Sequence, residues 1–241
     1  MATGPQRDYL GRAQAPAGAR AAEIDVGLRA YMQKVFGLMA GGTALTGVVA
    51  YFGATSGLYV QIAQTPLIWV LVFSPLAFAI FFGMKIQSMR ASTAQALFWV
   101  FSALMGLSLS YVFIRYTGAS IARTFFITAA TFAGMALYGY TTKRDLTAIG
   151  SFLLMGVLGL FVAMLVNLVL GSSALHFAIS VIGVLVFTGL TAYDAQKIKE
   201  MYYAGDGAEV ATKKAVMGAL NLYLDFINLF VFLLQFLGDR R

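Results

Sequence analysis

The sequence predicts an all-α membrane protein with seven transmembrane helices. Of its 241 residues, 60% are hydrophobic and only 11% are charged, whereas soluble domains average about 45–50% apolar and about 25% charged residues. The apolar residues form long runs between short polar segments, and a spanning helix needs about 20 such residues. Because backbone groups in lipid must bond within their own segment, and the runs do not alternate as barrel strands do, the runs predict helices.

Seven runs are long enough to cross a bilayer. They cover residues 35–53, 67–84, 94–114, 122–140, 146–170, 175–194 and 215–237. Residues 1–30 are basic, rich in Ala and Gly, and lack the apolar segment of a signal peptide. We therefore expect two parts, a mobile basic N-terminal tail over 1–30 and a transmembrane domain over 31–241.

Local signals support the first four runs. Gly37 and Gly41 in the first run form a GxxxG pair, which lets helix backbones approach closely. The second run begins after Pro66 and contains Pro75, where we expect a kink. The polar segment around Arg115 separates the third run from the fourth.

The last three runs are separated by clear connections. The segment TTKRD at 141–145 precedes the fifth run, and GSSA at 171–174 joins it to the sixth. Runs joined by so short a segment must be antiparallel neighbours. Gly156 and Gly159 mark a further helix contact in the fifth run. A lysine-bearing polar loop, which ends at Lys214, precedes the seventh run.

The distribution of Lys and Arg predicts the orientation. With the N-terminus in the cytoplasm, thirteen of the seventeen Lys and Arg residues fall on the inside and four on the outside. Cytoplasmic loops carry such an excess. We expect the N-terminus inside and the C-terminus outside, or both inside if the seventh run is re-entrant. The loops thus account for the net charge of +7 without a nucleic-acid partner.

The seventh run contains LNLYLDFINLF, with Asp225 at its centre. An aspartate at mid-membrane costs about 2.5–3.5 kcal/mol on insertion scales and faces a bundle interior or a water-filled cavity. The polar stripe of this helix shares one face and comprises Gly218, Asn221, Asp225, Asn228 and Gln235. These groups could simply bond neighbouring helices, but the carboxylate among them favours an ion pathway or a switch.

A second acid, Asp194, lies at the inner end of the sixth run, with Thr191 on the same face. Alone, it could be solvated or pair with Lys197. It could also meet Asp225 if the sixth and seventh helices pack together. A straight-rod estimate places Asp194 nearer the inner surface by about 10 Å, so the sequence alone leaves this contact open.

Other chemistries have few candidate residues. The chain has no cysteine, and its only histidine is His176, so we expect no histidine or thiolate metal site and a packing or interfacial role for His176. An intramembrane serine protease needs a histidine partner, and a retinal protein needs a lysine within a span; neither arrangement is present. We expect no enzyme activity and no tightly bound cofactor. Lys85, at the inner end of the second run, is either an anchor or a partner for an inner carboxylate.

Three segments resemble one family. FTGLTAYDAQKIK (187–199) and LNLYLDFINLFVFLLQFLG (220–238) resemble the C-terminal signature of the Bax inhibitor-1 family, also called transmembrane Bax inhibitor motif proteins. MQKVFGLMAGGTALTGVVAYF (32–52) resembles the start of its bacterial members. The resemblance implies a central C-terminal helix wrapped by two three-helix layers, located in the bacterial inner membrane.

The resemblance also implies a function. Family members form a pH-sensitive calcium leak controlled by two hydrogen-bonded aspartates, which match Asp194 and Asp225. A family arginine on the second helix can bind this pair; here Lys85 is the nearest candidate for that latch, and a lysine is a point charge without the planar fork of arginine. Bacterial relatives are also linked to the membrane protease FtsH.

Together these observations predict a gate. Two adjacent carboxylates in a low dielectric cannot both ionise cheaply, so a shared proton would hold the sixth helix against the seventh. Loss of the proton would open a path lined by Asn221, Asn228 and Thr191, with weak calcium binding at the two aspartates. The expected partners are the bilayer, calcium and protons. The alternative is a regulator of a membrane protease or stress response that transports nothing and acts through the basic tail.

Overall fold

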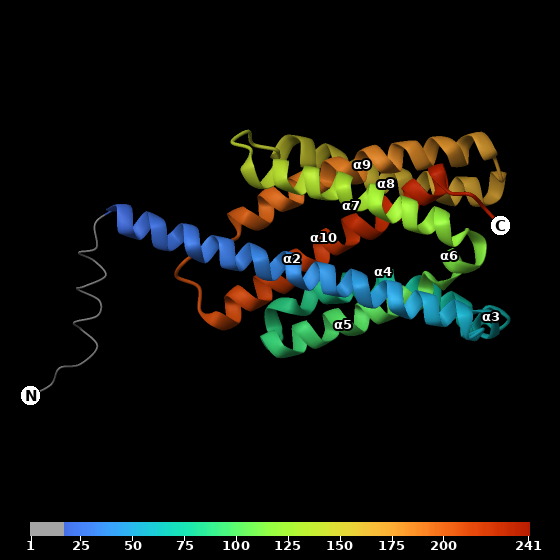
Figure 1. The fold of residues 1–241 in the computed structure, drawn as a ribbon, viewed down its shortest axis with the longest axis horizontal. Helices are drawn as coiled ribbons and strands as arrows, with labels where there is room; N and C mark the ends of the chain where they lie inside the picture. The colour runs from blue at the N-terminus through green and yellow to red at the C-terminus, as the bar shows by residue number, and fades with distance from the viewer. Residues whose placement is uncertain (1–16) are drawn as a thin grey trace, which may run out of the picture.

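The computed structural model describes residues 17–241, which form a bundle of helices (Figure 1). The elements are α2 (Ala17–Thr55), α3 (Leu58–Ala63), α4 (Leu67–Lys85), the short 3₁₀ turn η1 (Ile86–Ser88), α5 (Ala91–Ser108), α6 (Ser110–Arg115), α7 (Gly118–Thr141), α8 (Thr147–Leu170), α9 (Ser173–Glu200) and α10 (Ala208–Leu237). Seven spans in the described chain are long and apolar enough to cross a membrane, with α5 and α6 together forming the third. The predicted fold class is confirmed.

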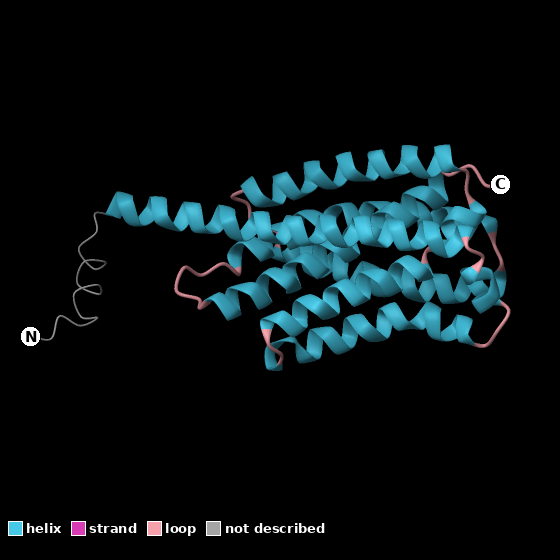
Figure 2. Cartoon of the chain, turned by 60° about the horizontal axis from the view of Figure 1, so that its bottom comes forward, coloured by secondary structure: helices cyan, strands magenta, loops and turns pink. Residues whose placement is uncertain are grey.

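The C-terminal helix α10 is the centre of the bundle. It is the most buried span, at 72%, whereas none of the other six exceeds 39%. It packs against α2 and α5 on one side and against α7 and α9 on the other. The helices α2, α4 and α5 form one layer and α7, α8 and α9 form the second, with α10 crossing diagonally between them (Figure 1). Figure 2 shows that the described part of the bundle consists of helices joined by loops.

The outward surface of the bundle is apolar. Large hydrophobic side chains cover the outer faces of α4 and α8, and Leu168 and Val169 are among the most exposed. Only 6% of the α8 span is buried inside the protein. A soluble protein rarely exposes apolar patches this large, so this surface identifies an integral membrane protein whose outer shell faces lipid.

Small residues allow the layers to pack closely. A side chain at Gly106 of α5 would lie 2.6 Å from the carbonyl oxygen of Thr46 in α2, which only a glycine avoids. The helices α7 and α9 make the same kind of approach in the second layer, where a side chain at Gly139 would overlap the backbone of Ala192. Such glycine contacts replace the hydrophobic effect as the basis of helix association in lipid.

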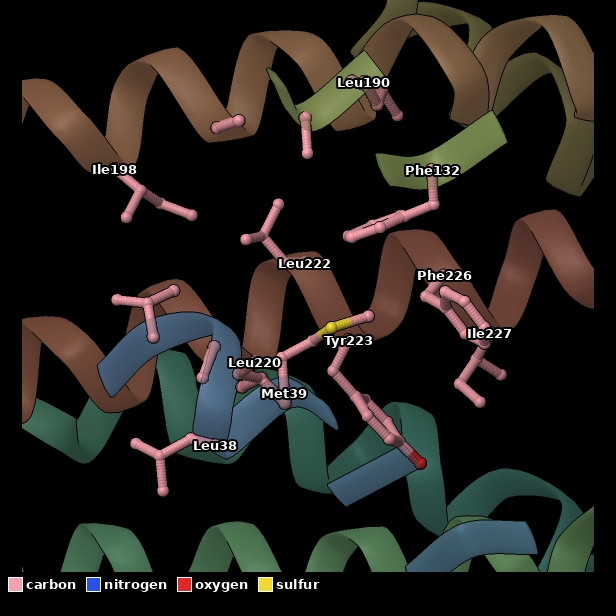
Figure 3. Close-up of a cluster of buried hydrophobic side chains, with 14 of the residues drawn as sticks. Leu38, Met39, Phe132, Leu190, Ile198, Leu220, Leu222, Tyr223, Phe226 and Ile227 are labelled. Carbon is pink, nitrogen blue, oxygen red and sulfur yellow. The ribbon is translucent and has the colours of Figure 1, made fainter. Parts of the chain in front are cut away.

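The core surrounds the middle of α10 (Figure 3). Leu222 and Phe226 extend toward the second layer, where Phe132 contacts the Phe226 ring at a centroid distance of 5.5 Å. Tyr223 points the other way, toward α2 and α5, and is fully buried. The central helix is therefore anchored to both layers by large side chains.

Two helices are longer than the sequence predicted. The tail was expected to extend to residue 30, but Ala17–Thr55 is one helix, so residues 17–30 belong to α2 and residues 1–16 lie outside the described chain. The Ala-rich segment after Ala17 has high helix propensity. Likewise, α10 begins at Ala208 rather than at residue 215. Apolar runs mark the membrane-embedded part of a helix, and both helices continue beyond it.

The helix α4 continues through Pro75. Proline has no N–H, so the carbonyl of Leu71 loses its usual helical partner. The hydroxyl of Ser74 donates to this carbonyl at 3.1 Å. A neighbouring hydroxyl thus satisfies the freed group, as is usual for proline within a membrane helix.

Candidate functional site

The polar stripe of α10 faces α9 along most of its length. The side chain of Gln235 accepts a hydrogen bond of 3.3 Å from Ser180, and the rings of Phe232 and Phe187 stack with centroids 5.8 Å apart. Nearer the inner end, Gly218 adjoins Ile198. These contacts follow one antiparallel register, and this register brings the two aspartates to the same level.

Asp194 of α9 and Asp225 of α10 lie next to each other in this interface, close enough for their carboxyl groups to interact. A hydrogen bond between the two carboxyl groups would need a proton on one of them, because two ionised carboxylates contain no donor. Asp225 is only 5% exposed, and its Oδ2 atom has no hydrogen-bond partner in the described structure. The sequence left open whether the two acids are neighbours, and the fold places them side by side.

The expected depth difference between the two acids is removed by the offset of their helices. Ile198 lies two residues before the end of α9, whereas its neighbour Gly218 lies ten residues after the start of α10. At 1.5 Å per residue, α10 extends past the inner end of α9 by about 12 Å. The straight-rod estimate counted both helices from the membrane border, but α10 begins well outside it.

Of the two lysines considered as partners for the aspartates, Lys197 lies near the pair and Lys85 does not. Lys197, one turn from Asp194, is the cation that acts electrostatically on its carboxyl group, and its Nζ atom also lies 5.5 Å from the centre of the Tyr193 ring. Lys85 is exposed at the end of α4, and no ion pair joins it to either aspartate in the described chain. The structure does not bring the expected latch cation to the site.

The other predicted pathway residues lie on α9 and α10 and are buried or half-buried. Thr191 is buried, and its hydroxyl donates to the carbonyl of Phe187 at 2.8 Å. Asn228 is half-buried and donates to the carbonyl of Leu224 at 2.8 Å. Asn221 is also half-buried. Thr191 and Asn228 thus form hydrogen bonds within their own helices.

A second buried polar contact, which the sequence reasoning missed, lies on the opposite face of α10. The hydroxyl groups of Tyr223 and Thr46 are 2.6 Å apart, and the Thr46 hydroxyl donates to the carbonyl of Ser102 at 2.9 Å. Tyr223 lies in an apolar stretch of α10, where a tyrosine is expected to pack as a hydrophobic residue. The hydroxyl group of Tyr223 was therefore the one feature of the sequence that could have indicated this polar contact. This network ties α10 to both α2 and α5.

The site contains few ligands for a metal ion. Among the described residues, no group of three or more His, Cys, Asp or Glu side chains converges. Calcium takes six to eight oxygen ligands when it is held firmly. Two carboxyl groups alone are therefore too few to hold calcium firmly.

These features define a class: a seven-helix integral membrane protein whose central C-terminal helix carries a buried aspartate beside a half-buried aspartate of the preceding helix. Comparison with known sequences places the chain more narrowly. A family model described as "Inhibitor of apoptosis-promoting Bax1" matches residues 28–241. The chain belongs to the Bax inhibitor-1 family, which confirms the resemblance in its C-terminal motifs.

Several bacterial relatives cover nearly the whole chain. An uncharacterized protein of Rickettsia prowazekii, RP147, is 52% identical over 219 residues, which span 90% of this chain and 93% of the relative. The inner membrane protein YbhL of Escherichia coli K12 is 47% identical over 219 residues, with 89% and 94% covered. An uncharacterized membrane protein of Streptococcus pyogenes is 37% identical over 228 residues, with 90% and 95% covered.

Proposed function

We propose that this protein is a pH-sensitive calcium leak channel gated by Asp194 and Asp225. The observation that carries the proposal is the buried contact between these two carboxyl groups, which join α9 to the central helix. Ionisable groups within a membrane are costly and are usually functional. A contact that exists only while a proton is bound is a suitable element for a gate.

The closed state of the proposed gate is the protonated pair. One shared proton lets the carboxyl groups bond to each other and holds α9 against α10. When solution pH rises and the proton leaves, two like charges face each other in a low dielectric and repel strongly. The inner half of α9 then moves away from α10 and exposes the amide of Asn221 along the stripe.

The open state offers oxygen atoms to a passing cation. Asp225 has an oxygen without a hydrogen-bond partner in the described structure, and both carboxylates are free once the proton has left. Calcium is a hard cation that prefers such ligands. Because the site is sparse, calcium would bind weakly and leave quickly, as a leak requires. The reaction is passage of an ion, without catalysis.

The proposed membrane and orientation follow from charge and similarity. YbhL is described as an inner membrane protein, and we assign this chain to the same kind of membrane. The inner end of the bundle, where Lys197 and Lys214 lie, faces the cytoplasm because basic residues concentrate on that side. The carboxyl-terminal end at Arg241 then faces outward, and the pair lies nearer the cytoplasm, whose pH it would sense.

Reconstituted vesicles test the gate. We expect calcium flux through the wild-type protein to increase as pH rises, and we expect Asp225→Asn and Asp194→Asn to reduce this pH response because an amide cannot ionise. Asp239→Asn is the matched control, because Asp239 pairs with Arg123 at 3.1 Å at the outer end. Unchanged flux and pH response in both pair variants would overturn the proposal.

One observation favours a second function, regulation of a membrane protease. The helix α2 has 39 residues and is about 58 Å long, so it extends beyond the other helices at the inner end (Figure 1). The protruding part precedes the bundle contacts and could present a docking surface. Deletion of residues 1–24 separates the two functions: a regulator would lose its effect on protease substrates, whereas a channel would still conduct calcium.

A further inference from the structure

The two layers leave an open groove between α2 and α7 in the outer half of the bundle. Figure 1 shows α10 between these two helices. The groove has a volume of about 370 Å³ and is walled by residues such as Gly47 of α2 and Ala122 of α7. Phe226, Ile227 and Phe230 of α10 form its floor. The groove therefore opens from the central helix toward the bilayer.

The chemistry of the groove excludes an ion or a polar ligand. Apart from Thr43 and Thr46, its lining residues are apolar. The Thr43 hydroxyl donates to the carbonyl of Met39 at 3.0 Å, and the Thr46 hydroxyl is engaged by Ser102 and Tyr223. Both polar groups are satisfied, so the groove fits an apolar occupant.

The size of the groove selects among apolar occupants. A helix is 10–12 Å across and rises 5.4 Å per turn, so one turn fills roughly 400–600 Å³. The groove, at about 370 Å³, holds less than one turn. A transmembrane helix from another chain does not fit, whereas a single flexible hydrocarbon chain does. The surrounding bilayer supplies such chains.

A positive charge follows closely in sequence on residues that line this groove. Arg115 ends α6, and its neighbours along the chain, Phe113 and Gly118, both line the groove. Its side chain is exposed, and no ion pair joins it to an acid in the described residues. The guanidinium group binds phosphate oxygens in a two-pronged geometry. A phospholipid headgroup at this level would therefore meet a complementary charge.

We propose that the groove between α2 and α7 is a lipid-binding site, which takes one acyl chain of a phospholipid whose phosphate is bound by Arg115. In this proposal the acyl chain lies on the side chains of Phe226 and Ile227, the two residues that follow Asp225 in the sequence of α10. The site does not depend on the proposed calcium leak, because it requires only the groove, its membrane location and the arginine.

The test uses vesicles of phosphatidylethanolamine and phosphatidylglycerol that contain phosphatidylglycerol with a photoreactive acyl chain. After illumination, labelled peptides are identified by mass spectrometry. We expect label on residues 226–230 of the wild type. Gly47→Leu and Ala122→Leu fill the groove from opposite walls, and each should reduce this label by about tenfold, because forcing extra methylenes into occupied space costs enough for that ratio.

Controls separate the site from general lipid contact. Gly37→Leu lies on α2, has open space around it and does not line the groove, so its labelling should match the wild type. Arg115→Gln should weaken labelling by the phospholipid probe but not by a photoreactive fatty alcohol, which lacks phosphate. Size-exclusion profiles and unfolding temperatures establish that each variant folds. The proposal would be overturned by unchanged labelling in both Gly47→Leu and Ala122→Leu. It would also be overturned if α8 were labelled as strongly as residues 226–230, or if Arg115→Gln reduced labelling by both probes equally.

Discussion

Tyr223 of α10 and Thr46 of α2 share a buried hydrogen bond of 2.6 Å. Asp225 lies two residues further along α10 and contacts α9 on the other side. Near its middle, the central helix thus has a polar contact with each layer. The contact at Tyr223 involves no carboxyl group, whereas the contact at Asp225 brings two carboxyl groups together, so a change in pH should act on only one of the two layers.

Tyr223→Phe tests the attachment to the first layer. The substitution removes one hydrogen bond, but Thr46 keeps its bond to Ser102, so unfolding free energy should fall by about 0.6–1.7 kcal/mol, the range for such bonds in membranes. Thermal unfolding in mild detergent measures the change. Tyr138→Phe, at an exposed position on α7, is the control. Equal stability of the Tyr223→Phe variant and the wild type would show that the bond contributes nothing.

Thr46→Val should cost more than Tyr223→Phe. Valine keeps the shape of threonine but leaves the Tyr223 hydroxyl buried without a partner, and an unsatisfied buried group costs about 1–3 kcal/mol. The same unfolding assay ranks the two variants. The reverse order would mean that the Tyr223 hydroxyl finds another partner.

Gly183→Ala tests the close contact of α9 with α10. An added methyl carbon would lie 2.6 Å from the ring of Phe232, and overpacking of this kind costs about 1–3 kcal/mol. We expect a lower unfolding temperature. Gly159→Ala in α8, where nothing lies within 4 Å, should have little effect. The double variant Gly183→Ala/Phe232→Leu should regain part of the lost unfolding temperature, because leucine gives the added methyl group more room. If it regains none, the strain does not arise from contact with Phe232.

Gln196→Leu should loosen the connection between α7 and α8. The buried amide of Gln196 donates to the carbonyl of Arg144 at 2.8 Å and accepts from the N–H of Leu146 at 2.9 Å. Loss of both bonds strands the Leu146 N–H, at about 1–3 kcal/mol. Hydrogen exchange at Leu146 should accelerate, while Gln61→Leu on the exposed helix α3 should leave it unchanged. Retained protection at Leu146 would contradict the role of Gln196.

Asp145 gives a pH-dependent prediction outside the membrane spans. Its Oδ1 accepts from the N–H of Thr147 at 2.8 Å, at the start of α8. Hydrogen bonds from the Thr147 side chain and backbone lower the pKa of this carboxyl group below its ordinary value of 3.8. The stabilisation is therefore present above the unfolded-state pKa and is lost as pH falls through the lower folded-state pKa.

Asp145→Ala should accordingly lower the unfolding temperature at neutral pH, and its difference from the wild type should disappear in acid. Asp145→Asn keeps an acceptor oxygen without a charge, so its effect should be smaller and should not change with pH. Parallel unfolding curves at neutral and acidic pH make the comparison. A deficit in Asp145→Ala that persists unchanged in acid would rule out the charged form as its cause.

The seven spans and the importance of Asp225 could be predicted because both follow from one physical fact, the cost of polar groups in lipid. Long apolar runs are required for each span, and an aspartate within one is conspicuous. The ends of α2 and α10 could not be predicted in the same way, because a helix that continues into water carries no apolar signal.

The partners of the polar residues were harder to predict. Whether Asp194 meets Asp225 depends on the relative translation of two helices, which the contacts of Gly183 with Phe232 and Gly218 with Ile198 determine. Glycine spacing indicates that a helix packs closely but not against which neighbour. For the same reason the sequence suggested Lys85 as a partner cation, whereas the fold leaves it exposed.

The central position of α10 has a consequence for biogenesis. Ribosomes deliver α2 to α9 first, so the inward faces of both layers exist before the helix that fills the space between them. Only residues 201–207 separate α9 from α10, so the two acids can enter the membrane together as a hairpin that already shares one proton. Such an entry hides one charge and shortens the time during which either acid faces lipid. Assembly of the bundle would thus be completed at its centre, by the segment that arrives last among the seven.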